Sequence, residues 1–281
     1  MSCIRSVGAI SLAVHAAACT VTLDAGRNIP HDPCAMADAA GPGCPPPGPL
    51  DNLVGYWRLD DGVGSTLAYD SSLRNNQGVL HDLDASTAWV GGRWQGALEI
   101  AHTGWVQVAP SPSIDAITDH LTVAAWVDLE GTINMTDGYG TALSRETGTT
   151  NYQHYHLALF MEGRPSLFLI TDAGFVVIQA MDPVPKGVWT HLAGVYDGAV
   201  ARLYVNGQEA GSKALTGRFT ADTSPVILGG NGNDASGVPT ELFPGRIDEL
   251  MLYARSLSPA EIAQLAAGAL FAGGSRDGAA D

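Results

Sequence analysis

The stretch FPGRIDELMLYARSLSPAEI, residues 243–262, decides the fold. In its first half, four residues alternate with four others: Ile247, Glu249, Met251 and Tyr253 against Asp248, Leu250, Leu252 and Ala254. Both sides of an extended segment with this pattern are largely apolar. The pattern predicts a strand that is covered on both faces, as inside a β-sandwich.

The second half of the same stretch predicts a short helix. Residues 258–261 read Ser-Pro-Ala-Glu, which supplies an N-cap hydroxyl, proline at the first helical position and a carboxylate that can complete a capping box. Ile262, Leu265 and Ala266 then form one apolar stripe, and Gly268 is a typical stop signal. We expect a stable C-terminal helix with a structural role.

Composition favours one large all-β domain. The chain has 281 residues, of which 34 are Gly, 16 are Pro and 46% are hydrophobic, so its apolar material is divided among many short segments. The formal net charge of -15 argues against nucleic acid and anionic membrane surfaces as partners, because both repel an acidic protein. Neutral ligands and cations suit this charge.

The first residues predict export. Residues 1–18 carry one Arg and a weakly apolar run that is too short to span a bilayer, which is typical of a signal peptide. Residues 16–19, Ala-Ala-Ala-Cys, resemble the lipobox of bacterial lipoproteins, in which Cys19 would carry the lipid that anchors the chain in the cell envelope. The usual Leu three residues before that Cys is missing. Ordinary cleavage after the Ala run, with secretion, remains the alternative.

The segment after Cys19 predicts a tether. Residues 19–52 are rich in Pro, Gly and Ala, so we expect a flexible linker. Cys34 and Cys44 lie close together there and could form a disulfide in an exported protein. Only His31 is near them, which disfavours zinc. The folded domain is predicted at 53–268, with a disordered tail at 269–281.

Short strands recur through the rest of the chain. Alternation predicts strands at 97–100 and 105–108 and a half-buried strand at 121–129. The strands expected at 155–161 and 166–171 flank a turn. Asn206-Gly207, between 200–205 and 208–213, is the strongest hairpin signal in the sequence. The expected fold is an antiparallel two-sheet jelly roll sandwich with one short C-terminal helix.

Several of these segments together resemble one family. They are residues 55–65 (GYWRLDDGVGS), 70–72 (DSS), 121–127 (LTVAAWV), 187–198 (GVWTHLAGVYDG), 203–207 (LYVNG) and 245–258 (GRIDELMLYARSLS). In this order they resemble the laminin-G-like jelly roll domain of the concanavalin A-like lectin and glucanase superfamily. The resemblance implies a sandwich of two curved sheets that acts as a binding or adhesion module outside cells.

Fold alone leaves the function open, because lectins, adhesion modules and glycosidases share it. Retaining glucanases need two carboxyl groups about 5 Å apart. The sequence contains no Glu-x-Asp-x-x-Glu arrangement, and Asp248 and Glu249 are adjacent, so they should point to opposite faces of a strand. We therefore expect a non-catalytic module that binds carbohydrate. A structural or protein-adhesion domain and a glycoside hydrolase are the alternatives.

Carbohydrate recognition combines an aromatic surface with amides and carboxylates. The candidates on expected rim loops are Tyr139, Asn151, Tyr152 and Tyr155, with Trp105 and residues 231–234 nearby. Trp57, Trp126 and Trp189 fall in the family segments and are expected in the core. His154 and His156, two residues apart, would share one strand face, but they lack a third metal ligand, so packing or hydrogen bonding is their expected role.

Calcium is the one cofactor that the sequence suggests. Domains that resemble this one often hold it in rim loops, and calcium takes oxygen ligands that loop carboxylates and amides supply. The predicted ligands are Asn231, Asn233, Asp234 and Asp248, with residues 134–138 as a second loop. The chain also departs from the family pattern at residues 100–106, where two expected acids are absent.

Overall fold

The computed structural model describes residues 51–101, 104–133, 138–146, 153–220, 223–231 and 238–268. The chain divides into the units Met1–Gly48 and Pro49–Asp281, and all described residues belong to the second unit. The predicted signal peptide, Cys19, Cys34, Cys44, all but the last two residues of the predicted tether, and the tail at 269–281 lie outside the described residues. Among the described residues, no helix is long and apolar enough to cross a membrane.

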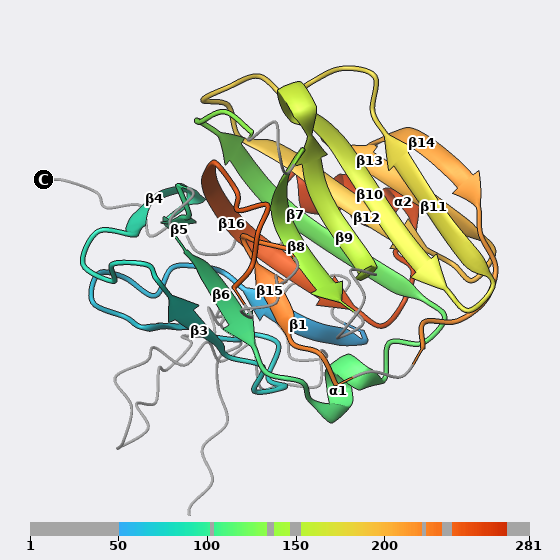
Figure 1. Cartoon of the computed structure of the whole chain (residues 1–281), viewed down its shortest axis with the longest axis horizontal. Helices are drawn as coiled ribbons and strands as arrows, with labels where there is room; N and C mark the ends of the chain where they lie inside the picture. The colour runs from blue at the N-terminus through green and yellow to red at the C-terminus, as the bar shows by residue number, and fades with distance from the viewer. Residues whose placement is uncertain are drawn as a thin grey trace, which may run out of the picture. The chain divides into compact units, whose positions relative to one another are not determined.

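Two antiparallel sheets form a sandwich, as predicted, and Figure 1 shows them stacked face to face. Sheet A has the order β14-β13-β12-β7-β16-β5-β4, with β1 also paired to β16. Its strands are β1 (Leu53–Trp57), β4 (Trp89–Trp94), β5 (Gly96–Glu99), β7 (Leu121–Leu129), β12 (Thr190–Tyr196), β13 (Val200–Val205), β14 (Gln208–Ala214) and β16 (Gly245–Tyr253).

Sheet B has the order β11-β10-β9-β8-β15-β6-β3-β2. Its strands are β2 (Leu67–Ala68), β3 (Gly78–His81), β6 (Trp105–Val108), β8 (Tyr139–Glu146), β9 (Gln153–Phe160), β10 (Arg164–Thr171), β11 (Gly174–Gln179) and β15 (Val226–Leu228). The helical elements are α1 (Pro112–Asp115), the 3-10 turn η1 (Met161–Gly163) and α2 (Pro259–Ala266). The sequence predicted α2 but not α1, which Ser111 caps in the same way as Ser258 caps α2.

Strand β16 lies inside sheet A, between β7 on one side and β5 and β1 on the other. It is buried at every position except the partly exposed Arg246, which confirms the prediction of a strand covered on both faces. Gly245 begins the strand, and a Cβ atom there would lie 2.0 Å from the carbonyl oxygen of Asp128 on β7. Only glycine permits this close approach of the two backbones.

A β-bulge interrupts β16 and changes which side chains face the core. Asp248 pairs with Trp126 of β7, but the next pair joins Met251 to Ala124, so one extra residue lies between them. That residue is Glu249, whose φ of 49° is in the left-handed region. The simple alternation expected from the sequence therefore breaks at this point.

Because of the bulge, Ile247, Leu250 and Leu252 all enter the main core between the sheets. Met251 and Tyr253 point the other way, into a second apolar cluster that the two helical residues Ile262 and Leu265 complete. Helix α2 therefore covers the outer face of sheet A beside the end of β16.

Strand β7 is buried at all nine positions, so the prediction of a half-buried strand was wrong. Its polar face is covered by parts of the chain that are distant in sequence. Thr122 Oγ1 donates to the Arg255 carbonyl oxygen at 2.8 Å and accepts from Leu257 N at 2.9 Å. Trp126 lies edge-on to Trp94, with ring centroids 5.0 Å apart. The alternation of residues within one strand does not show whether distant segments pack on its polar face.

The predicted hairpin signal is confirmed. Asn206 and Gly207 join β13 to β14 with φ values of 49° and 79°, as a primed two-residue turn requires. Gly207 also lies against α2, because a Cβ atom there would approach Ala263 Cα to 3.2 Å and Ala266 Cβ to 3.1 Å. The turn and the C-terminal helix are thus packed together.

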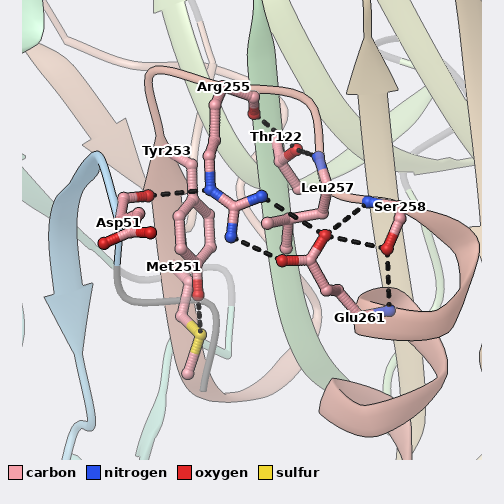
Figure 2. Close-up of polar contacts among 8 residues, drawn as sticks. All are labelled: Asp51, Thr122, Met251, Tyr253, Arg255, Leu257, Ser258 and Glu261. Carbon is pink, nitrogen blue, oxygen red and sulfur yellow. Dashed lines mark hydrogen bonds and ion pairs between the residues drawn. The ribbon is translucent and has the colours of Figure 1, made fainter. Parts of the chain in front are cut away.

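Both ends of the described domain meet at Arg255, as Figure 2 shows. Its Nε donates to the Asp51 carbonyl oxygen at 2.8 Å, and its terminal nitrogens bind both carboxylate oxygens of Glu261 at 2.6 and 3.3 Å. Glu261 also completes the predicted capping box with Ser258. The hydrogen bond from Arg255 lowers the pKa of Glu261 to about 2.

Candidate functional site

The outer face of sheet B carries a row of side chains from neighbouring strands. Residues paired directly across an antiparallel sheet point to the same side. Ser144, His156, Phe168 and Val177 are paired in this way across β8, β9, β10 and β11. Their neighbours along the strands, such as Leu167, belong to the main core, so this row faces away from sheet A.

Tyr139 lies at one end of this face. Its ring centroid is 4.9 Å from that of Phe160 and 5.2 Å from that of His156, so three rings from β8 and β9 are packed together. Tyr139 and Phe160 are both partly exposed. Burial raises the pKa of the Tyr139 hydroxyl, and the nearby Glu241 carboxylate raises it further.

Polar groups surround this aromatic cluster. Asn231 Nδ2 donates to Glu241 Oε2 at 2.6 Å, and the same oxygen lies 3.7 Å from His156 Nε2. His156 Nε2 is also 2.8 Å from Thr141 Oγ1. Burial lowers the pKa of His156 to about 3, so its imidazole is neutral at physiological pH. Glu241 therefore brings negative charge to a site whose other groups are neutral.

The loop that carries Glu241 is fixed to the sheet by backbone bonds. Asn231 and Thr240 exchange two backbone hydrogen bonds of 2.9 Å, and Thr141 N donates to the Glu241 carbonyl oxygen at 2.9 Å. Glu241 itself has a φ of 51°, and its carboxylate lies beside β9, 3.7 Å from His156 Nε2. The carboxylate is thus held in place by the fold around it.

One buried oxygen of this site has no hydrogen-bond partner among the described residues. It is Asn231 Oδ1, on a residue that is 2% exposed. An unpaired buried amide oxygen costs about 1–3 kcal/mol. Its environment suits a hydroxyl donor of a ligand, a water molecule or a cation.

Two further aromatic residues lie on the same face, on β10 and β11. The rings of Phe168 and Phe175 lie 6.0 Å apart and are inclined by only 29°. Phe175 is 67% exposed, which is unusual for a phenylalanine. The partly exposed rings Tyr139, Phe160, Phe168 and Phe175 form what we call the aromatic row.

Trp105 lies on the same sheet but not on a rim loop. It opens β6 and is only 7% exposed, and His81 of β3 stacks on it with ring centroids 5.3 Å apart and planes inclined by 9°. The structure therefore places this predicted ligand residue on the outer face of sheet B, where a histidine covers one side of its ring.

The prediction that Tyr155 lies on a rim loop was wrong. Strand β9 begins at Gln153, so Tyr155 lies within the strand, where it is 1% exposed and part of the main core. The loop placement of Tyr139 was also wrong, since this residue begins strand β8, but its side chain is partly exposed. Asn151 and Tyr152 lie outside the described residues. Trp57 and Trp126 are buried as expected, and Trp189 is partly exposed.

The predicted metal ligands fall in two places. Asn231 is described above, whereas Asn233, Asp234 and most of the second predicted loop lie outside the described residues. Asp248 is fully buried, and its Oδ2 accepts hydrogen bonds from Arg93 N at 2.7 Å and Trp94 N at 3.1 Å. Within the part of the chain that the structure describes, no group of three or more His, Cys, Asp or Glu side chains could hold a metal ion. Calcium stays a prediction.

The expectation that Asp248 and Glu249 point to opposite faces was wrong, because the bulge lies between them. Asp248 is paired with Trp126 on the outer face of sheet A. Glu249 Oε2 accepts a short hydrogen bond from the Tyr56 hydroxyl, and Tyr56 packs against the apolar cluster on that same outer face. Burial raises the pKa of Asp248 to about 7 and that of Glu249 to about 8.

Five residues of the candidate site were not predicted from the sequence as ligand residues: Glu241, His156, Phe160, Phe168 and Phe175. Each is separated in sequence from Tyr139, and only the strand pairing brings them together. No signal in the sequence indicated Phe168 and Phe175, because each lies in a continuous apolar run without alternation.

Comparison with solved structures supports the fold. Domain 4 of AbnA, an extracellular arabinanase from Geobacillus stearothermophilus solved with arabinotriose, has a TM-score of 0.59 at 22% identity, covering 76% of this chain and 98% of that one. The binding domain of Paraclostridial Mosquitocidal Protein 1 has a TM-score of 0.58 at 20% identity, covering 79% and 53%.

A third similar structure is the Trypanosoma rangeli sialidase in complex with sialic acid. Its TM-score is 0.59 at 17% identity, covering 83% of this chain but only 35% of the sialidase chain. This chain thus spans about a third of the sialidase. A search of curated proteins found no match.

A family model also matches the sequence directly. It is the laminin G model described as concanavalin A-like lectin/glucanases superfamily, and it matches residues 101–263. This range runs from the end of β5 into α2 and includes both the aromatic row and β16. The chain therefore belongs to the concanavalin A-like lectin/glucanases superfamily, as a laminin G-like domain.

Proposed function

We propose that this protein is a non-catalytic module that binds carbohydrate on the outer face of sheet B. One observation supports the proposal above all. The partly exposed Tyr139 ring lies beside the Glu241 carboxylate and the Asn231 amide. Sugars combine apolar ring faces with hydroxyl groups, so an aromatic ring next to fixed hydrogen-bonding groups suits them.

Binding without bond cleavage is part of the proposal. Glycoside hydrolysis needs two carboxyl groups on either side of the scissile bond. Among the described residues of this face, Glu241 is the one carboxylate beside Tyr139. Asp248 and Glu249 have the raised pKa that a general acid needs, but they are 0% and 2% exposed, so a sugar cannot reach them.

Binding to immobilised polysaccharides, measured by pull-down with the exported chain, tests the proposal. We expect Tyr139→Ala to abolish retention and Glu241→Gln to weaken it, whereas the control Tyr69→Ala should bind like the wild type. Tyr69 is 43% exposed and precedes Asp70, away from the candidate site. Equal retention of Tyr139→Ala and wild type would refute the site, and release of reducing sugar would refute a non-catalytic role.

Calcium binding belongs to the proposal as a supporting role. The ion would be held by the Asn231 side chain together with Asn233 and Asp234, and its chemistry would be to fix the loop that ends in Glu241. The unpaired buried Asn231 Oδ1 supports this assignment. We expect chelation with EDTA to weaken the pull-down and added calcium to restore it; unchanged retention would contradict the role of the ion.

We further propose that the protein works outside the cytoplasm, either anchored by a lipid on Cys19 or freely secreted. The support is the sequence of residues 1–19 and the net charge of -15, which suits a soluble domain facing the medium. Mass spectrometry of the mature N-terminus distinguishes the two forms, because a lipid adds mass to Cys19. A chain that retains residues 1–18 would contradict export through this signal.

A further inference from the structure

A second group of aromatic and polar side chains lies on the outer face of sheet A. We propose that Trp189, Asp128 and Arg246 form a second ligand site there, which binds a single sugar ring through its hydroxyl groups. The site lies on the layer opposite Tyr139, and no residue is common to the two sites. This inference therefore goes beyond the function proposed above and can be tested separately from it.

Strand register places these three side chains on one face. Arg246 of β16 is paired with Asp128 of β7. The preceding residue of β7, Val127, belongs to the main core, so Asp128 and Arg246 point outward. Val127 is paired with the first residue of β12, which Trp189 directly precedes. Trp189 therefore lies opposite Asp128 on the outer side of the sheet.

The Trp189 ring is held in position and is still accessible. The Arg246 guanidinium lies 5.4 Å from the ring centroid, which is typical of a cation–π contact. Arg246 is fixed in turn by Asp128 Oδ2 at 2.5 Å and Glu130 Oε1 at 2.8 Å. Trp189 itself is partly exposed. A partly exposed indole ring in a fixed position offers the flat apolar surface on which a sugar ring can stack.

Two polar atoms of this group have no hydrogen-bond partner in the part of the chain that the structure describes. They are Asp128 Oδ1, an acceptor, and Arg246 Nε, a donor, and both atoms are buried. Buried polar atoms in folded proteins are almost always hydrogen-bonded. A hydroxyl group donates one hydrogen bond and accepts others, so the hydroxyls of a sugar can satisfy both atoms. The two unpaired atoms therefore indicate the chemistry of the ligand.

Glu130 is the group that a sugar would displace. Its side chain is 40% exposed, and it binds the same nitrogen of Arg246 as Asp128 does. Exposed ion pairs contribute little to stability, because water competes for both partners. A sugar hydroxyl can therefore replace Glu130 at small cost and reach the buried carboxylate of Asp128, while the bond between Arg246 and Asp128 stays in place.

The next set of paired residues along the strands limits the ligand to one ring. There Trp126 of β7 lies between Asp248 of β16 and His191 of β12. Trp94 lies edge-on to the Trp126 ring at 5.0 Å, and the Arg93 guanidinium lies over it at the same distance. These two side chains cover that part of the face, so a ligand seated at Trp189 cannot extend along the strands toward α2.

Titration of the whole chain with monosaccharides tests the inference. The probes are the methyl glycosides of glucose, galactose, xylose and arabinose, and calorimetry measures the affinity. We expect at least one probe to bind to the wild type with an affinity that Trp189→Ala lowers at least tenfold and Tyr139→Ala leaves within about twofold. Loss of affinity in Tyr139→Ala alone would instead belong to the function proposed above.

Further variants separate contact with the ligand from a structural role. Trp189→Phe keeps a ring for stacking and should retain the affinity within about fivefold, but it should lose the change in tryptophan fluorescence that the probe causes. Asp128→Asn replaces an acceptor oxygen by a donor and should weaken binding at least fivefold. Glu130→Gln removes the competing charge and should bind at least as tightly as the wild type. The control Val188→Ala, at a 50% exposed position, should change nothing.

The outcomes are distinct, and urea unfolding checks each variant for a wild-type fold. If Trp189→Ala binds every probe like the wild type, the site is refuted, whatever Tyr139→Ala does. If Trp189→Ala does not fold, Asp128→Asn and Glu130→Gln decide, because direct contact with the sugar predicts opposite effects for them and equal effects would refute it. If no probe binds to the wild type, the inference is wrong, and water alone occupies the position beside Asp128.

Discussion

Replacing Glu249 by Gln should change how the stability of the protein depends on pH. Glu249 is 2% exposed, and burial raises its pKa from 4.5 to about 8. The folded protein therefore binds a proton there between about pH 4.5 and pH 8, where the unfolded chain has released it. Because the folded state binds more protons in this window, the free energy of unfolding falls as pH rises through it.

The magnitude follows from the size of the pKa difference. Each pKa unit corresponds to about 1.4 kcal/mol, so the full rise would cost about 5 kcal/mol at alkaline pH. The value of about 8 already includes the opposing effects of Arg58 and of the hydrogen bond from Tyr56, which stabilise the carboxylate. We expect Glu249→Gln, which keeps the shape and removes the titration, to gain about 2–4 kcal/mol over the wild type between pH 5 and pH 9.

Urea unfolding followed by tryptophan fluorescence at pH 5, 7 and 9 measures the effect. The variant should still lose some stability as pH rises, through Asp248 and Asp61, whose pKa values burial raises to about 7 and about 6. A control, Glu162→Gln, changes an acid whose side chain is 73% exposed and should keep the wild-type slope. If Glu249→Gln also keeps that slope, the carboxyl is charged in the folded protein and the reasoning is wrong.

Two further predictions concern the contacts of the C-terminal helix. Arg255→Ala removes its bonds to Asp51 and Glu261 and should cost about 1–3 kcal/mol at pH 7. Because the pKa of Glu261 is depressed, the ion pair contributes above about pH 4.5 and its contribution is lost toward about pH 2. The difference in free energy of unfolding between the wild type and Arg255→Ala should therefore be smaller at pH 2.5 than at pH 7. An equal difference at both pH values would contradict this assignment. Gly207→Ala should cost about 1–3 kcal/mol, since it forces alanine to a φ of 79° against α2, and a wild-type melting curve would show that the turn can relax.

Local signals in the sequence predicted the local parts of the fold. Asn206-Gly207 forms its hairpin and Ser258 caps its helix, because each depends on residues within a few positions. The bulge at Glu249 could not be predicted in this way, since an alternating pattern looks regular until its partner strand is known. The short strands β2, β3 and β4 were also missed, because turn-forming residues dominate that region, and so were β8, β11 and β15.

The candidate site was harder to predict than the fold. Tyr139 was recognised as an aromatic residue near a loop, but its neighbours depend on which strand pairs with which. His156 meets Tyr139 only because β8 and β9 are adjacent, and Glu241 reaches them through a loop after β15. Tyr155 was assigned to a loop, whereas β9 begins at Gln153 and turns the Tyr155 side chain into the core.

The junction at Arg255 bears on how the domain would be presented to a ligand. It brings residue 51 beside the segment that leads into α2, and that helix packs on the outside of sheet A. The aromatic row occupies the outside of the other layer. An attachment through either end of the described domain would therefore lie on the sheet A side, and the outer face of sheet B would point away from the attachment.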